Sequence, residues 1–297
     1  MSMCHLHDGR QEYDSCTVWA VKPRSIVFDL FGDYIRYRGG SVRLRELVEL
    51  MSCFDVGEST VRVVIARLRK EGWFDAERDG RQTHYALNQK SLRLLDEGRN
   101  RIFNRLRTEW DRRWYMVIYS VPETDRGVRE QIRKELAWLG FGPLATATYV
   151  SPHDRLAEVS EKFADLPSVR LDMLTCQSAG LAVDREMAAR CWDLGSLDTD
   201  YRELLRTYFA RLPSYRDGSL SPRDALVESI RLNYDYRKFP FRDPDLPVEL
   251  LPESWPGREA HEMFLEAHDL LRGPANAYAD QVMGLADQPA NPRVQRS

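Results

Sequence analysis

The feature that most constrains the fold is a helical pattern followed at once by two short strands. Residues 60–72, TVRVVIARLRKEG, have helical spacing, and Gly72 suits the position just after a helix. The apolar positions of that helix are Val61, Val64, Ile65 and Leu68. Trp73–Arg78 and Thr83–Leu87 are predicted to be a pair of strands, because the intervening Asp79-Gly80 is a strong hairpin signal. A helix leading into a β-hairpin is therefore expected.

Two further helices are predicted before this unit. Pro23 suits the first turn of a helix that Gly39-Gly40 would end. A second helix follows Ser41, a turn spans 54–57, and Glu58 or Ser59 can begin the third helix. The apolar positions of the first two helices are Ile26, Leu30 and Tyr34, then Leu44, Leu47, Val48 and Met51. Helix, helix, turn, helix, hairpin is the order of a winged helix-turn-helix.

The third helix would enter the major groove of DNA, which has the width of an α-helix. Arg62, in its first turns, could contact guanine, whereas Arg67, Arg69 and Lys70 suit phosphates or local acids. The candidate DNA-binding residues are Ser59, Thr60, Arg62, Val63, Ala66, Arg67, Arg69, Lys70, Arg78 and Arg81. A merely solvated basic face, or a module that binds protein, is the alternative interpretation.

The charge distribution agrees with a polyanion partner for the first part of the chain only. The whole chain has a net charge of −3, but residues 22–113 carry 20 Lys and Arg against 14 Asp and Glu. Residues 114–297 carry 22 against 29 and are acidic. A basic module joined to an acidic remainder indicates that the module alone meets nucleic acid.

Composition excludes several classes of protein. The 297 residues are 43% hydrophobic and 30% charged, which is a globular composition of two or three domains. We find no run as long as a membrane helix and no signal-peptide pattern at the start. Five cysteines without CxxC spacing indicate reduced thiols in a cytoplasmic protein, and no spacing typical of metal binding or nucleophilic catalysis is present. We therefore expect that the protein binds no metal ion, needs no cofactor and is not an enzyme.

The central part alternates strands and helices. A long helix is predicted over Ser91–Trp110, with Leu92, Leu95, Ile102, Phe103, Leu106 and Trp110 on its apolar face. The strands and helices that follow are Trp114–Val121, Asp125–Leu139, Ala145–Val150, Asp154–Leu166 and Val169–Cys176, with a short fourth strand near Phe141–Leu144. This order predicts a ferredoxin-like domain, which would serve as a dimerisation platform.

The remainder is predicted to be mainly helical, with one unusual segment. Residues 231–242, RLNYDYRKFPFR, interleave cations and aromatic rings inside an acidic region, which suits an anionic ligand bearing an aromatic or adenine ring. The candidate effector-binding residues are Arg231, Tyr234, Tyr236, Arg237, Lys238, Arg242 and Trp255. Pairing of these arginines with acids such as Asp235, Asp243 or Asp245 is an equally good interpretation.

Three motifs resemble the PaaX family of bacterial transcriptional repressors of phenylacetate catabolism. They are the LFGDY-x-R-x-RGG run followed by VR-x-x-x-x-RL-x-KEGW, the segment VIYSVPETDRGVREQIRKELAWLGFGPLATATYVSP, and the segment YDYRKFPFRDPDLPVELLPESWPGREA. They occur in the family's order, and the resemblance covers about Arg24 to Tyr278.

The resemblance implies an effector and raises one enzymatic alternative. An aryl-CoA thioester, phenylacetyl-CoA in the family, would present phosphates to Arg231, Arg237, Lys238 and Arg242. The family's middle domain resembles CRISPR-adaptation endoribonucleases, whose chemistry needs an aspartate near the end of the first strand. Residues 117–121 contain no carboxylate, and the next is Glu123, so nuclease chemistry is not expected.

The sequence therefore predicts an α+β protein with an N-terminal winged helix-turn-helix, a central ferredoxin-like domain and a mainly helical C-terminal domain. The expected divisions are an arm at 1–22, the DNA-binding domain at 23–88, a linker helix at 89–112, the ferredoxin-like domain at 113–178, the helical domain at 179–288 and a tail at 289–297. The expected function is a homodimeric repressor of an aromatic-acid operon, released from double-stranded DNA by an aryl-CoA effector. The alternatives are a protein-interaction scaffold and a metal-dependent RNA-processing protein.

Overall fold

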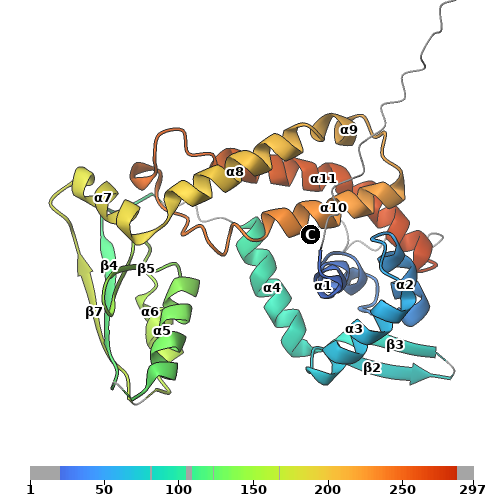
Figure 1. Ribbon diagram of the computed structural model, residues 1–297, viewed down its shortest axis with the longest axis horizontal. Helices are drawn as coiled ribbons and strands as arrows, with labels where there is room; N and C mark the ends of the chain where they lie inside the picture. Colours follow the sequence, from blue (N-terminus) through green and yellow to red (C-terminus); the bar gives the residue numbers. More distant parts are fainter. Residues whose placement is uncertain (1–20, 81, 105–108, 123, 167, 286–297) are drawn as a thin grey trace, which may run out of the picture.

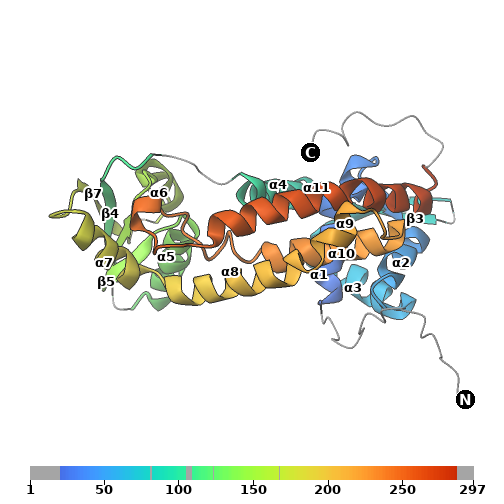
Figure 2. The ribbon, with the colours of Figure 1, turned by 90° about the horizontal axis from the view of Figure 1, so that it is seen from above.

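Long helices form the centre of the molecule, and two small sheets lie at its opposite ends (Figures 1 and 2). The computed structural model describes residues 21–80, 82–104, 109–122, 124–166 and 168–285. The mixture of helices and two antiparallel sheets is an α+β fold, as predicted. The predicted arm at 1–22 lies almost wholly outside the described residues, and so does the tail.

The N-terminal module combines three helices with a three-stranded sheet. Its helices are α1 (Pro23–Asp33), α2 (Leu44–Ser52) and α3 (Glu58–Lys70), with a short 3-10 helix at Ile35–Tyr37. Its strands are β1 (Ser41–Arg43), β2 (Phe74–Asp79) and β3 (Gln82–Leu87), in the order β1-β3-β2. The predicted Asp-Gly hairpin is present, and Gly80 has the positive φ of 57° that such a turn requires.

Two details of this region differ from the sequence prediction. Strand β1 stands where the second helix was expected to begin, because Val42 pairs with Tyr85 of β3 and buries its side chain. The predicted helix Ser91–Trp110 is wrong at its far end, since α4 (Gln89–Phe103) stops at Asn104. Trp110 instead packs edge-on against Trp114, with ring centroids 5.7 Å apart, and so belongs to the core of the second sheet.

The second sheet has four antiparallel strands in the order β5-β6-β4-β7. The elements are β4 (Trp114–Ser120), α5 (Arg126–Trp138), β5 (Gly142–Ala145), β6 (Thr148–Ser151), α6 (Leu156–Phe163) and β7 (Arg170–Cys176). Val117 and Tyr119 of β4 share a core with α5 and α6, whereas Trp114 packs with α7 (Leu181–Cys191). The strand predicted near Phe141–Leu144 is thus present as β5.

The C-terminal helices run back along the molecule to the N-terminal module. They are α8 (Leu194–Phe209), α9 (Leu212–Arg216), α10 (Pro222–Tyr236) and α11 (Gly257–Val282), with a 3-10 turn at Val248–Leu250. Figure 2 shows α8, α10 and α11 lying lengthwise beside one another. One continuous hydrophobic core joins Leu30 and Phe31 of α1 to Leu226 of α10 and Phe264 of α11. The module and the C-terminal helices are therefore packed as one body.

Candidate nucleic-acid interface and ligand cavities

Helix α3 is held in place by a narrow apolar stripe. Val61, Ile65 and Leu68 are fully buried, at the i, i+4, i+7 spacing that puts them on one side of a helix. The helix begins after Gly57, and Gly72, with a φ of 76°, turns the chain from its end toward β2. All of the opposite side is left for other contacts.

The residues predicted to bind DNA lie together on that opposite side. Ser59, Thr60, Arg62, Val63, Ala66, Arg67, Arg69 and Lys70 are all exposed on α3. Arg78 is exposed on β2, where it pairs with Thr83 of β3 beside the hairpin turn. Arg81 lies outside the described residues. The structure thus brings nine of the ten candidates to the outer face of α3 and the adjoining strand.

Several of these cations are held by carboxylates on the same module. Glu58 accepts hydrogen bonds from Arg62 Nε at 2.9 Å and Nη2 at 2.5 Å. Glu71 accepts from Arg67 Nε at 2.8 Å and also from Arg24, and these hydrogen bonds lower the pKa of the Glu71 carboxyl. Such exposed pairs orient their side chains at little energetic gain, so their arginines can exchange a carboxylate for a phosphate.

Within the described residues, Arg69 and Lys70 lie within salt-bridge distance of no acid. Both belong to the last turn of α3. They therefore carry uncompensated positive charge on the outer face, next to the Arg67–Glu71 pair.

The candidate effector-binding residues do not converge on one cavity. Tyr236 is fully buried, with its hydroxyl 2.8 Å from His261 Nδ1 and its ring stacked on Phe264. Trp255 packs edge-on against Tyr201, with ring centroids 5.9 Å apart, and lines a different cavity. Lys238 lies over the ring of Phe239, 5.7 Å from its centroid.

The arginines of this set are mostly engaged with carboxylates. Arg231 donates to Glu228 at 2.7 Å, and Arg242 donates to Asp200 at 2.5 Å. Arg237 pairs with Asp29 of α1, and its guanidinium also lies over the ring of Tyr234, 4.9 Å from the centroid. All three arginines contact acidic side chains, but these acids are Glu228, Asp200 and Asp29, and none of them is among the suggested Asp235, Asp243 and Asp245.

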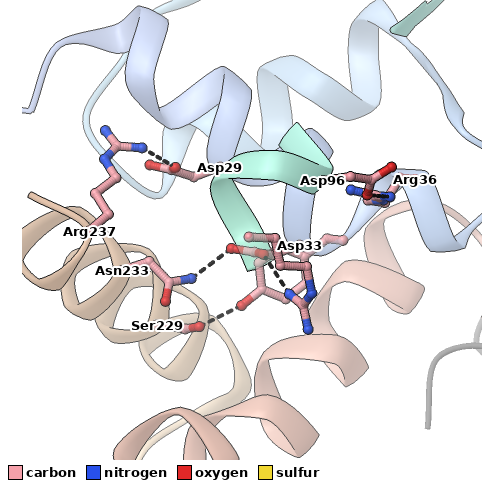
Figure 3. A network of polar contacts seen from close by, with 9 residues as sticks. Asp29, Asp33, Arg36, Asp96, Ser229, Asn233 and Arg237 are labelled. Carbon is pink, nitrogen blue, oxygen red and sulfur yellow. Dashed lines mark hydrogen bonds and ion pairs between the residues drawn. The ribbon is translucent and has the colours of Figure 1, made fainter. Parts of the chain in front are cut away.

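A buried polar network connects the module to α10, and sequence reasoning missed it (Figure 3). Asp33 accepts a hydrogen bond from Asn233 Nδ2 at 2.6 Å, and Tyr34 donates to Ser229 at 2.8 Å. Asp29, one turn earlier, meets Arg237. Burial raises the pKa of Asp29 to about 8, although Arg237 acts in the opposite direction.

An apolar cavity of about 350 Å³ adjoins this network. It lies between α1, α4 and α10, and its volume is within the range of small-molecule sites. Its apolar lining is Phe28, Trp73, Leu94, Leu95, Ile102, Phe103 and Phe241. Arg99 and Arg237 stand at its polar side. A ligand here would touch both the module and α10.

A larger, polar crevice of about 790 Å³ lies between α4, the second sheet domain and the segment after α10. Arg101 of α4 lies there beside the rings of Trp138 and Phe241, which stack on each other, with its guanidinium 4.8 and 5.4 Å from the two ring centroids. Its described hydrogen bonds go to the carbonyl oxygens of Pro240 and Trp138, not to a carboxylate. Burial, followed by the nearby Arg155, lowers the pKa of Arg101. The lining of the crevice contains the cations Arg101, Arg155 and Lys162 but also five acids, Glu97, Glu158, Glu161, Asp243 and Asp245.

In the described part of the chain, no three His, Cys, Asp or Glu side chains are grouped so that they could hold a metal ion. No helix among the described residues is long and apolar enough to cross a bilayer. Glu123, the nearest carboxylate to the end of β4, lies outside the described residues.

Comparison with known proteins covers nearly the whole chain. Residues 22–91 match the model of a PaaX-like protein, residues 107–188 a PaaX protein central Cas2-like domain, and residues 192–281 a PaaX-like protein C-terminal domain. The transcriptional repressor PaaX of Escherichia coli (strain K12) is 29% identical over 269 residues, which are 88% of this chain and 84% of that protein. These matches define a transcription regulator and not an enzyme. The chain belongs to the PaaX family.

A solved structure shares the fold. It is the uncharacterized protein Rv0674 from Mycobacterium tuberculosis, with a TM-score of 0.59 and 22% sequence identity. The match covers 87% of this chain and 99% of that one.

Proposed function

We propose that this chain is a DNA-binding transcriptional repressor whose residues 23–88 form a winged helix-turn-helix. The single observation that carries the proposal is the uncovered outer face of α3, which carries four cations and whose opposite side is buried in the module. The order β1-α2-α3-β2-β3, with the hairpin beside α3, supports a helix placed in the major groove and a wing placed on the neighbouring backbone.

The rest of the chain is proposed to form a linker helix at 89–112, a ferredoxin-like dimerisation domain at 113–178 and a helical effector domain at 179–288. The strand-helix-strand-strand-helix-strand order with sheet order β5-β6-β4-β7 supports the ferredoxin-like assignment. A homodimer would place two α3 helices in half-sites one or more turns of DNA apart. Two linked modules gain affinity that one small module lacks.

The effector is proposed to be an aryl-CoA thioester, as the PaaX resemblance implies. In this proposal Arg101, Arg155 and Lys162 of the polar crevice meet the phosphates, although five carboxylates line the same crevice, and the neighbouring apolar cavity holds the aromatic ring. Both cavities are lined by α4, which follows the hairpin directly. A ligand that favours a different setting of α4 by about 2.7 kcal/mol would lower the affinity for DNA about 100-fold.

A mobility-shift assay on the DNA upstream of the protein's own gene tests DNA binding. Arg62→Ala should weaken binding about 5- to 150-fold, since a bidentate guanine contact contributes roughly 1–3 kcal/mol. Arg202→Ala is a matched control, because Arg202 of α8 also pairs with an acid four residues earlier, through Nε at 2.8 Å from Asp198. Equal affinities of the Arg62 variant and the wild type would remove α3 from the interface.

Thermal-shift titration tests the effector. Phenylacetyl-CoA should stabilise the wild type more than free phenylacetate or CoA alone does, and Arg101→Ala should reduce that difference. Stabilisation by the thioester that is unchanged in the variant would place the ligand elsewhere. A protein that binds RNA only with added metal, or that binds no nucleic acid, would favour the RNA-processing or scaffold alternative.

A further inference from the structure

The outermost line of α3 has two apolar residues at its middle, between a serine and a lysine. Ser59, Val63, Ala66 and Lys70 follow one another at i, i+4, i+7 and i+11, which places them along one line of the helix. That line lies opposite the buried residues Val61, Ile65 and Leu68. Val63, at its middle, is 67% exposed. A partner that approaches the outer face of α3 therefore contacts Val63 at the middle of that face.

The charged residues stand on both flanks of this line. The helical period places Arg62 and Arg69 to one side of Val63, and Thr60 and Arg67 to the other. Arg62 and Arg67 are further tied to the acids Glu58 and Glu71. In a groove, the central line faces the floor, and the flanks lie nearer the two strands, from where a long side chain such as that of Arg62 still reaches a base edge.

We propose that Val63 reads the C5-methyl group of a thymine on the floor of the major groove, so that each half-site of the operator carries a thymine at that position. This inference rests on the proposed DNA-binding function. The other base edges present mainly hydrogen-bonding groups in the major groove and no methyl group, and a valine packed against those groups would remove their water without replacing its hydrogen bonds. The thymine methyl group is the one apolar feature that valine can contact favourably.

A protein partner fits the same surface less well. Binding hot spots are clustered aromatic or large apolar side chains surrounded by further contacts that exclude water. Val63 is flanked along its own line by the small Ser59 and Ala66, and arginines stand on both sides of it. One exposed valine between cations is too small an apolar patch for such a hot spot, but it matches the size of one methyl group.

Replacement of thymine by deoxyuridine tests the proposal, because it removes only the methyl group and keeps base pairing. The full-length protein is first used to select its binding site from random duplex DNA, and each thymine of a half-site is then replaced in turn. Affinities are measured for the wild type, for Val63→Ala and for Val248→Ala. Val248 is a matched control, since it is 66% exposed and belongs to the 3-10 turn far along the chain from α3.

We expect one uracil position per half-site to weaken wild-type binding about four-fold, which corresponds to about 0.8 kcal/mol for one buried carbon group. Val63→Ala should bind the thymine site about four-fold more weakly and should no longer distinguish thymine from uracil at that position. Val248→Ala should behave as the wild type. Two results would overturn the role of Val63 and leave the DNA-binding function standing. In one, wild-type affinity is unchanged by deoxyuridine at every position; in the other, Val63→Ala loses as much affinity to deoxyuridine as the wild type does. Failure to select any DNA would overturn the DNA-binding function as well.

Discussion

The buried carboxyl of Asp29 gives the protein a stability that depends on pH in a calculable direction. Its pKa is about 8 in the folded chain against 3.8 for an ordinary aspartate, so the folded state holds the proton more tightly than the unfolded state. When folding raises the pKa of an acid, the protein is most stable at a pH below the pKa of that acid in the unfolded chain. This stability is lost as the pH rises toward the pKa in the folded chain. One pKa unit corresponds to 1.36 kcal/mol. This carboxyl therefore lowers the free energy of unfolding by about 4 kcal/mol as the pH rises from 5 to 8.

Asp29→Asn fixes the side chain in its neutral form and should remove that cost. Relative to the wild type, the variant should gain about 4 kcal/mol of stability between pH 5 and pH 8, which is a melting-temperature difference on the order of 10 °C. Below pH 8 the wild-type side chain is already neutral, so the substitution removes no charge there, and the amide oxygen of asparagine can accept the hydrogen bond from Arg237. Melting curves followed by circular dichroism at half-unit pH steps measure the difference.

Asp96→Asn is the matched control, because Asp96 also pairs with an arginine of the module, Arg36, but its side chain is 52% exposed. We expect the melting temperature of this variant to follow that of the wild type at every pH. A constant difference between Asp29→Asn and the wild type from pH 5 to pH 8 would refute the assignment of a protonated Asp29.

Three further outcomes are expected. The affinity for DNA should fall steeply with salt, with a log-log slope of about −7 for eight phosphates neutralised by a dimer, measured by fluorescence anisotropy from 50 to 200 mM salt; a flat response would contradict the basic face. Gly142→Ala should destabilise the fold by roughly 1–3 kcal/mol in chemical denaturation, because a Cβ there would lie 2.6 Å from the Trp192 ring, and an unchanged midpoint would show that the ring can move. Burial lowers the pKa of His268 to about 4, so the stability that its neutral form supports is lost as the pH falls from 6.5 to 4. The melting temperature of His268→Phe should therefore fall less than that of the wild type over this pH range, and equal falls would exclude His268 as the cause.

Local patterns made the N-terminal module predictable. The apolar spacing of α3, the Asp-Gly turn and the glycine after the helix all act within a few residues, so the sequence carries them openly. Strand β1 escaped prediction because three residues are too short for a period, and its existence depends on a partner, β3, about 40 residues away. The helix over Ser91–Trp110 was drawn too long because Trp110 has the right spacing but packs on Trp114 instead.

The contacts between distant segments were not predictable. Arg237 looked like a candidate for an anionic ligand because it lies among aromatic residues, but its acid is Asp29, 208 positions away in the chain. Asp29 and Asp33 in turn resemble ordinary surface residues of a helix until α10 is seen to cover them. A single sequence records the residue types in such a network but not which of them meet.

The return of the last helices to the first has a consequence for how the protein is made. During synthesis from the N-terminus, residues 23–87 leave the ribosome long before α10 and α11 exist, so the part of α1 that packs against these helices is exposed to solvent. The nascent module must wait for almost the whole polypeptide before its core closes. Shortened translation products would therefore be substrates for chaperones and proteases rather than free-standing competitors for the operator.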